Sequence, residues 1–262
     1  MEHHAHAPRR TTATTRKVCA FCEAPGRLTG EHIFGNWLRK LGYNGIGLHE
    51  TNDSVQRRGV FSAKVKIACA SCNNGWMSRL EQDAKPLLIH LFRSHGRSIP
   101  LEQDAQLTLA RWAFKTAVVC SYADKSQINL FPIEHRRAFY LNDQPPDQAW
   151  VRIGAMAVPS NPSKGEHLAA VEFGTRLDTL TSDNSSLSFP TYRATIRLIN
   201  VVFCVMGYAT TEITMRDQPS KDFRMITLPL WPMRRPTIWW PPPAPAWRAS
   251  LDMPHSGIWG LT

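Results

Sequence analysis

The stretch "CASCNNGWM", residues 69–77, places two asparagines directly behind a cysteine pair of the CxxC type. A second CxxC pair stands upstream, in "CAFCEAPGRLTGEHIFGNWL", residues 19–38. Each pair is typical of a tight turn that presents two sulfurs to one metal ion, and four thiolates bind zinc tetrahedrally with no open position. The sequence therefore predicts one structural zinc ion held by Cys19, Cys22, Cys69 and Cys72.

Composition indicates a soluble globular protein with a basic N-terminal part. Of 262 residues, 43% are apolar and 20% charged, and the net charge is +10. The first 100 residues hold 15 Lys and Arg against 7 Asp and Glu, so most of the excess lies there. Such an excess favours a polyanion partner, most simply nucleic acid, over a merely solvated face. The candidate phosphate contacts, clustered around an expected strand at 60–68, are Arg57, Arg58, Lys64 and Lys66.

The sequence carries no sign of a membrane or secretory segment. The first 17 residues have no apolar core, and the longest apolar run, 198–209, is too short to cross a bilayer as a helix. Cys120 and Cys204 stand alone in apolar surroundings and are expected to be small buried hydrophobes. We therefore expect a cytoplasmic protein that does not bind a membrane.

The organisation along the chain favours an α+β fold in four parts. A flexible basic leader is expected at 1–17 and a cysteine-bearing domain at 18–95. A mixed helix and antiparallel-strand domain of unknown role is expected at 96–230, and a Pro/Trp-rich segment at 231–262. The tryptophans of this last segment are expected to pack on their own domain rather than to stack on bases.

Periodicity and breaker residues predict the individual elements. Residues 42–59 are expected to form a loop or hairpin. The expected helices are 73–94, with a break or kink at Pro86, then 101–123 and 132–142. The expected strands are 60–68, 149–158, 167–177, 192–209 (interrupted at Asn200) and 223–231.

The segment "GEHIF" sets an acid and a histidine side by side between the two cysteine pairs. Adjacent side chains on a strand point to opposite faces, but at the end of a strand they can share one site. Asn73 follows the second pair at an expected helix start, where its amide oxygen can reach a hard cation. Glu81, further along the same helix, is expected to be a surface or capping residue.

These elements, "CAFC", "EHIF", "CASC" and "NN" in this order, resemble the HNH endonucleases, the zinc-stapled branch of the ββα-metal (His-Me finger) nucleases. The resemblance covers residues 18–82. The string "CNNGWMSRLE", followed by "KPLL", also looks like a group of bacterial and phage proteins with this domain at the N-terminus. The C-terminal region resembles no family known to us.

The resemblance implies a ββα-metal domain and a role for each matching residue. His32 would be the general base that deprotonates the attacking water. Glu31 and Asn73 would bind a catalytic Mg²⁺ or Mn²⁺, and the zinc knuckle would aim the helix start that carries Asn73. The implied function is metal-dependent hydrolysis of DNA, although the sequence does not separate DNA from RNA.

The sequence departs from the family pattern at two positions. Gly35 stands where a proline is common, and Lys64 stands where the middle asparagine is expected. The alternative function is a zinc-dependent nucleic-acid-binding module with a degenerate, inactive site. A third interpretation makes the C-terminal region a platform for a protein partner, with the N-terminal domain as its effector.

Overall fold

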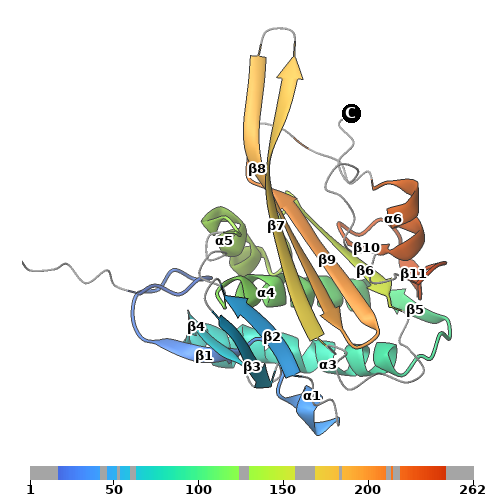
Figure 1. The fold of residues 1–262 in the computed structure, drawn as a ribbon, viewed down its shortest axis with the longest axis horizontal. Helices are drawn as coiled ribbons and strands as arrows, with labels where there is room; N and C mark the ends of the chain where they lie inside the picture. The colour runs from blue at the N-terminus through green and yellow to red at the C-terminus, as the bar shows by residue number, and fades with distance from the viewer. Residues whose placement is uncertain are drawn as a thin grey trace, which may run out of the picture.

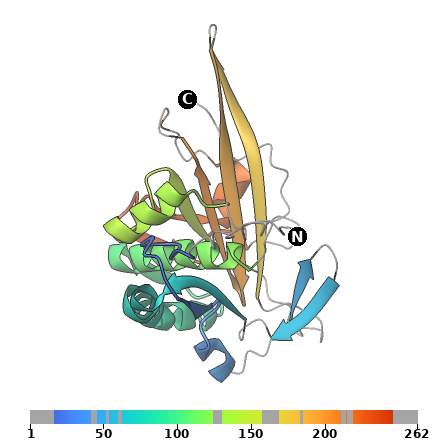
Figure 2. The ribbon, with the colours of Figure 1, turned by 90° about the vertical axis from the view of Figure 1, so that its left-hand side faces the viewer.

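A five-stranded antiparallel sheet makes up most of the fold, with the long helices packed on one face and the short helix Lys221–Ile226 on the other (Figures 1 and 2). The computed structural model is of the mixed α+β class, and all described strand pairs are antiparallel. The residues that the structure describes are 17–41, 46–51, 54–59, 63–123, 130–156, 169–182, 185–210, 214 and 219–245.

The large sheet has the strand order β10-β6-β9-β8-β7. Strands β7 and β8 pair along their whole length, whereas β9 accompanies β8 only from Leu198 to Thr191. The outer part of β7 and β8 therefore projects as a two-stranded arm (Figure 1). The strands are β6 (Ala149–Ala155), β7 (Ala169–Ser182), β8 (Ser185–Leu198), β9 (Val201–Tyr208) and β10 (Leu228–Trp231).

Helix α4 (Gln103–Ser121) runs against one face of this sheet. Because side chains alternate along a strand, Ala194 and Ile196 of β8 face the helix together with Phe203 of β9. All three are fully buried, as is Trp112 of α4, whose ring lies 5.5 Å from that of Phe203. Helix α3 (Ser78–Phe92) packs beside α4, so α4 lies at the centre of the molecule.

The N-terminal part consists of two antiparallel strands followed directly by a helix. Strand β1 (Leu28–His32) pairs with β4 (Lys64–Cys69), and a bulge lies between Thr29 and Gly30. The chain then continues through α2 (Ala70–Cys72) and the π-helical turn η2 (Asn73–Met77) into α3.

Shorter elements surround this arrangement. Helix α1 (Trp37–Lys40) follows β1, and a hairpin of β2 (Ile46–Thr51) and β3 (Ser54–Gly59) separates it from β4. The remaining elements are β5 (Ile99–Glu102), α5 (Ile133–Asn142), α6 (Lys221–Ile226) and β11 (Thr237–Trp240). Within the described residues, no helix is both long and apolar enough to cross a membrane.

Two details of the predicted elements are wrong. The helix is not broken at Pro86, which lies exposed inside a continuous α3, because Ala84, Leu88 and other apolar side chains bury the opposite face. The irregularity lies instead at Gly75 in η2, whose backbone angles (φ −92°, ψ −111°) are not helical.

The predicted strand at 223–231 begins only at Leu228. Residues 221–226 are helical because the Ser220 hydroxyl accepts the Phe223 N–H at 3.2 Å, and Phe223 and Ile226 share a buried face. The interruption predicted at Asn200 is present as a turn between β8 and β9, where Ile199 has a φ of 59°.

One continuous hydrophobic core crosses the boundary expected at residue 95. It runs from Phe21 in the first cysteine turn through Leu88 of α3 and Phe114 of α4 to Trp240. Buried Arg136 of α5 adds a polar tie, because its guanidinium donates to the Ala20 carbonyl at 2.9 Å. The cysteine-bearing part is therefore packed onto the C-terminal part rather than separated from it by a linker.

The described part of the Pro/Trp-rich segment also packs on the chain's own core, as expected. Strand β11 pairs with β5, and Trp231 and Trp240 are buried, whereas Trp239 is 59% exposed. The tryptophans beyond residue 245 lie outside the described residues.

Candidate functional site

Four cysteines from two CxxC pairs converge at the end of β4 and just before η2. The sulfur atoms of Cys19, Cys22, Cys69 and Cys72 all lie within 4.8 Å of one another. The Cys22 and Cys69 sulfurs are 3.6 Å apart, and none of the four is in a disulfide. A tetrahedral zinc site with Zn–S bonds of about 2.3 Å has sulfur separations of about 3.8 Å. The cluster could therefore hold a metal such as zinc.

Aromatic side chains pack behind this cysteine cluster. The Trp76 ring meets Phe21 edge-on at 5.1 Å and Phe139 of α5 edge-on at 5.5 Å. The other two cysteines are not part of the cluster, and burial raises the pKa of Cys120 to about 12 and that of Cys204 to about 11. They are small buried hydrophobes, as expected.

A pocket of about 370 Å³ opens beside the cysteine cluster, between the end of β1 and the start of α3. Glu31, His32 and Asn73 all line it. Glu31 and His32 are adjacent in sequence, and both reach the pocket because β1 ends at His32 and the chain then turns. The three residues predicted to be catalytic thus lie around one cavity.

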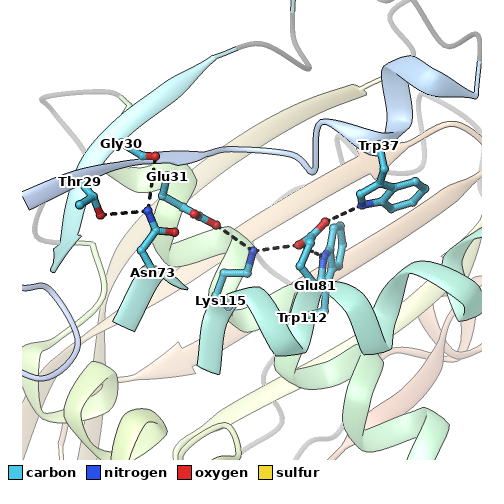
Figure 3. A network of polar contacts seen from close by, with 8 residues as sticks. All are labelled: Thr29, Gly30, Glu31, Trp37, Asn73, Glu81, Trp112 and Lys115. Atoms are coloured by element: carbon cyan, nitrogen blue, oxygen red, sulfur yellow. Dashed lines mark hydrogen bonds and ion pairs between the residues drawn. The ribbon is translucent and has the colours of Figure 1, made fainter. Parts of the chain in front are cut away.

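The hydrogen bonds of Asn73 fix the orientation of its amide. The Thr29 hydroxyl donates to the Ala68 carbonyl at 3.0 Å, so it accepts from the Asn73 Nδ2 at 2.9 Å. The same Nδ2 lies 3.4 Å from the Gly30 carbonyl, which can only accept. The amide oxygen Oδ1 is therefore turned away from β1 and lies on the side of the Glu31 carboxylate (Figure 3).

Glu31 is a largely buried carboxylate with a cationic neighbour. Its side chain is 15% exposed, and its Oε1 lies 3.5 Å from the Lys115 ammonium. Burial raises the pKa of Glu31 above its usual value; Lys115 lowers it in part, and the nearby Glu81 carboxylate adds to the rise. Carboxylate and amide oxygens are the donors that Mg²⁺ and Mn²⁺ prefer, so Glu31 and Asn73 fit a hard divalent cation.

The surroundings of His32 favour its neutral imidazole. Partial burial lowers its pKa and so does Lys64, while Glu81 acts in the opposite direction. Lys64 pairs with His32 across β1 and β4, so the residue at the position of the family's middle asparagine does lie next to the histidine. Its effect there is to disfavour the protonated ring.

The expectation that Glu81 is a surface or capping residue is wrong. Its Oε1 accepts the Trp37 indole N–H at 2.8 Å, and its Oε2 accepts the Trp112 indole N–H at 2.9 Å (Figure 3). The same Oε2 lies 3.1 Å from the Lys115 ammonium. Burial alone would raise the pKa of Glu81, but Lys115 and the two indoles together lower it, so the carboxylate is ionised.

Gly35 is the residue that makes room for this network. A Cβ added there would lie 2.1 Å from the Glu81 Oε1 and 2.2 Å from the Trp37 Nε1. Any side chain at this position would therefore disturb the Trp37–Glu81 hydrogen bond. This is a physical reason for glycine where the family pattern has proline.

Lys115 is the pocket neighbour that sequence reasoning missed. It is 1% exposed, and burial by itself would lower its pKa, but Glu81 and Glu31 outweigh this and raise it. The signal was a lysine within "WAFKTAVVC", on the apolar face of a central helix. A buried lysine needs a carboxylate partner, but the sequence alone does not identify which carboxylate that is.

The four predicted phosphate contacts lie in two places. Lys64 and Lys66 are exposed on β4, opposite His32 and Gly30. Arg57 and Arg58 lie on β3 of the separate hairpin, opposite Leu48 and Gly47. Figure 2 shows this hairpin standing apart from the rest of the molecule, so only the two lysines lie directly beside the pocket.

Comparison with known proteins found no matching family model, no matching curated protein and no matching solved structure.

Proposed function

We propose that the protein is a metal-dependent endonuclease of the HNH type that hydrolyses DNA phosphodiester bonds. The observation that carries the proposal is the convergence of Glu31, His32 and Asn73 on one pocket beside a four-cysteine cluster. The arrangement of two antiparallel strands leading through a cysteine turn into a helix adds support.

In this proposal His32 accepts the proton of the water that attacks phosphorus. A neutral imidazole suits this task near pH 7, and its lowered pKa keeps it neutral. Glu31 and Asn73 would hold a Mg²⁺ or Mn²⁺ ion, which when bound supplies charge stabilisation to the phosphate and the leaving oxygen. Lys64 and Lys66 would attract the phosphate backbone at the rim of the pocket.

The four cysteines would keep their own ion, distinct from the one in the pocket. Soft thiolates prefer zinc and hard oxygens prefer magnesium, so the two sites would not exchange metals freely. The zinc would act by holding the first turn of η2, and with it Asn73, against β1. The proposal therefore assigns zinc a structural role and the divalent ion in the pocket the chemical role.

A second candidate function is a zinc-stapled module that binds nucleic acid without cutting it. It is favoured by the ammonium of Lys115, which already lies 3.5 Å from the Glu31 carboxylate. It is also favoured by the lysine at the position of the family's middle asparagine. This module would need the basic residues but neither His32 nor Glu31.

A cleavage assay separates the two candidates. Purified protein is incubated with supercoiled plasmid and with linear single- and double-stranded DNA, over a range of Mg²⁺ and Mn²⁺ concentrations. The nuclease is expected to nick plasmid, to stop with EDTA, and to recover on addition of Mn²⁺ while its zinc content stays at one ion per chain. DNA binding with no cutting in any of these metals would contradict the nuclease and support the binding module.

Asn73→Ala tests the metal ligand. The variant should cut poorly, because one of two protein ligands is lost, and excess Mn²⁺ should restore part of the rate by mass action. Asn74→Ala, at the neighbouring pocket position, is the matched control. Strong loss in Asn74→Ala with normal cutting by Asn73→Ala would show that the two asparagines exchange roles.

A further inference from the structure

Lys115 is a buried charge that the proposed reaction does not use. It lies in the middle of α4, and its side chain is 1% exposed. A buried ammonium is costly unless carboxylates and hydrogen bonds compensate it. The chain pairs it with two carboxylates from two different elements, Glu31 of β1 and Glu81 of α3.

Glu81 is the fixed member of this cluster. Both of its oxygens are engaged, Oε1 by Trp37 of α1 and Oε2 by Trp112 and Lys115 of α4. Indole N–H groups are rigid donors on large buried rings, so the carboxylate between them has little freedom. Glu81 therefore anchors the ammonium, and both of its oxygens already accept hydrogen bonds from the protein.

Glu31 is the second carboxylate within reach of the ammonium. Lys115 contacts its Oε1 at 3.5 Å, which leaves Oε2 as the oxygen for a ligand role. Glu31 lines the pocket, whereas Lys115 does not. Figure 3 shows the ammonium between the two carboxylates, on the side of Glu31 that faces α4. Any effect of Lys115 on the pocket therefore passes through Glu31 or Glu81, the two pocket residues that its ammonium contacts.

From this geometry we propose that Lys115, anchored by Glu81, is the positioning residue that holds the Glu31 carboxylate in the pocket. As a role in catalysis, it rests on the proposed function. The consequence is that two parts of the chain build the site. β1 and η2 supply Glu31, His32 and Asn73, and α4 supplies the charge of Lys115 that fixes Glu31. The two-strand and helix unit would then be an incomplete site without the C-terminal part.

A double-mutant cycle on the full chain tests this without requiring activity. The variants are Lys115→Met, Glu31→Gln and the double variant. Lys115→Met keeps an unbranched apolar side chain and removes the charge. Unfolding is measured by denaturant titration at pH 7.5 with zinc present. If the two side chains interact, the effects are non-additive by at least tenfold in the unfolding equilibrium constant, about 1.4 kcal/mol. Additive effects would overturn the proposal.

Two further variants keep the cycle decisive. Glu102→Gln removes a carboxylate on β5 that hydrogen-bonds Thr237, and it should show no coupling with Lys115→Met. If Lys115→Met does not fold, the double variant Lys115→Met, Glu81→Gln is used instead. It removes the ammonium and its anchoring carboxylate together, so that neither charge is left buried without a partner. In that background Glu31→Gln should no longer destabilise the folded protein, because Lys115, the partner of Glu31, is already absent. An unchanged effect of Glu31→Gln there would equally overturn the proposal.

Kinetics distinguish positioning from a purely structural role. Lys115→Met should lower kcat about tenfold or more and leave KM for DNA within about twofold, because the ammonium does not touch substrate. Combined with Glu31→Gln, it should lower kcat no further. If the parent itself does not cut, the proposed function fails on that result alone, and the unfolding cycle still decides whether Lys115 holds Glu31.

Discussion

The cysteine-bearing part and the five-stranded sheet are each stabilised in a different way. Around the cysteines the chain has short strands and a four-thiol cluster, and its pocket is lined by charged and amide side chains. The sheet and α4 share a hydrophobic core in which Ala194, Ile196 and Phe203 are fully buried. The first part carries a cysteine cluster that could hold a metal such as zinc, whereas the second is stabilised by its hydrophobic core. The candidate site lies where the two meet.

The largest expected effect is the unfolding of the cysteine-bearing part while the five-stranded sheet stays folded. Cys69→Ser removes one thiolate, and structural zinc sites contribute about 10–16 kcal/mol in zinc-finger peptides, so the region around β1, β4 and η2 should unfold. Zinc content should fall to near zero, measured by elemental analysis, and limited proteolysis should cut first in this region. Retained zinc with an unchanged protease pattern would contradict the assigned ligand set.

Cys204→Ala is the matched control for that experiment. Cys204 is 2% exposed in β9 and packs as a small hydrophobe. Its replacement should cost about 1 kcal/mol, as ordinary buried substitutions do, and should leave the zinc content unchanged.

An intermediate effect comes from the pH dependence of His135 of α5, in the second region. Burial lowers the pKa of His135 to about 4, despite the nearby Glu134, and its Nδ1 lies 2.8 Å from the buried Tyr192 hydroxyl. The unfolded chain binds this proton near pH 6.5 and the folded chain only near 4. Stability should therefore fall as pH decreases through this window, by about 3 kcal/mol at its lower end.

The measurement for His135 is a set of denaturant titrations between pH 7.5 and 5, in the parent and in His135→Gln. The parent should lose more stability than the variant over this range. The difference between the two profiles reports the titration of His135 alone, because the cysteines contribute equally to both. Parallel profiles would show that His135 does not titrate differently in the folded state.

The smallest expected effect concerns the basic hairpin. Arg57→Ala with Arg58→Ala should reduce the slope of log affinity for DNA against log salt by about 1.8, because each lost phosphate contact releases about 0.9 fewer counterions. Lys64→Ala with Lys66→Ala, on β4 beside the pocket, is the comparison pair. Fluorescence anisotropy from 50 to 300 mM salt measures both. If the salt dependence of DNA affinity is unchanged in one of these double variants, that pair of residues does not contact DNA.

The cysteine cluster could be predicted from the spacing of its CxxC pairs, and the pocket triad from the resemblance to the HNH pattern, which implies that Glu31, His32 and Asn73 share one site. Two CxxC pairs identify their ligands, and Asn73 follows the second pair directly. The role of Glu81 could not be predicted, because its partners Trp37, Trp112 and Lys115 come from two other elements and meet only after α3 and α4 pack together. Helix 221–226 was missed because a single serine cap outweighs an apolar pattern too short to distinguish a strand from a helix turn.

The most direct test of the central claim compares His32→Ala with the parent in single-turnover cleavage of plasmid DNA with Mn²⁺. Loss of a general base typically costs about 10²–10⁴-fold in rate, so we expect a fall of this size. Zinc content, unfolding midpoint and DNA affinity, measured on the same preparations, should match those of the parent. A His32→Ala protein that cuts as fast as the parent would contradict the mechanism, and one that loses zinc or unfolds would show that the histidine is structural.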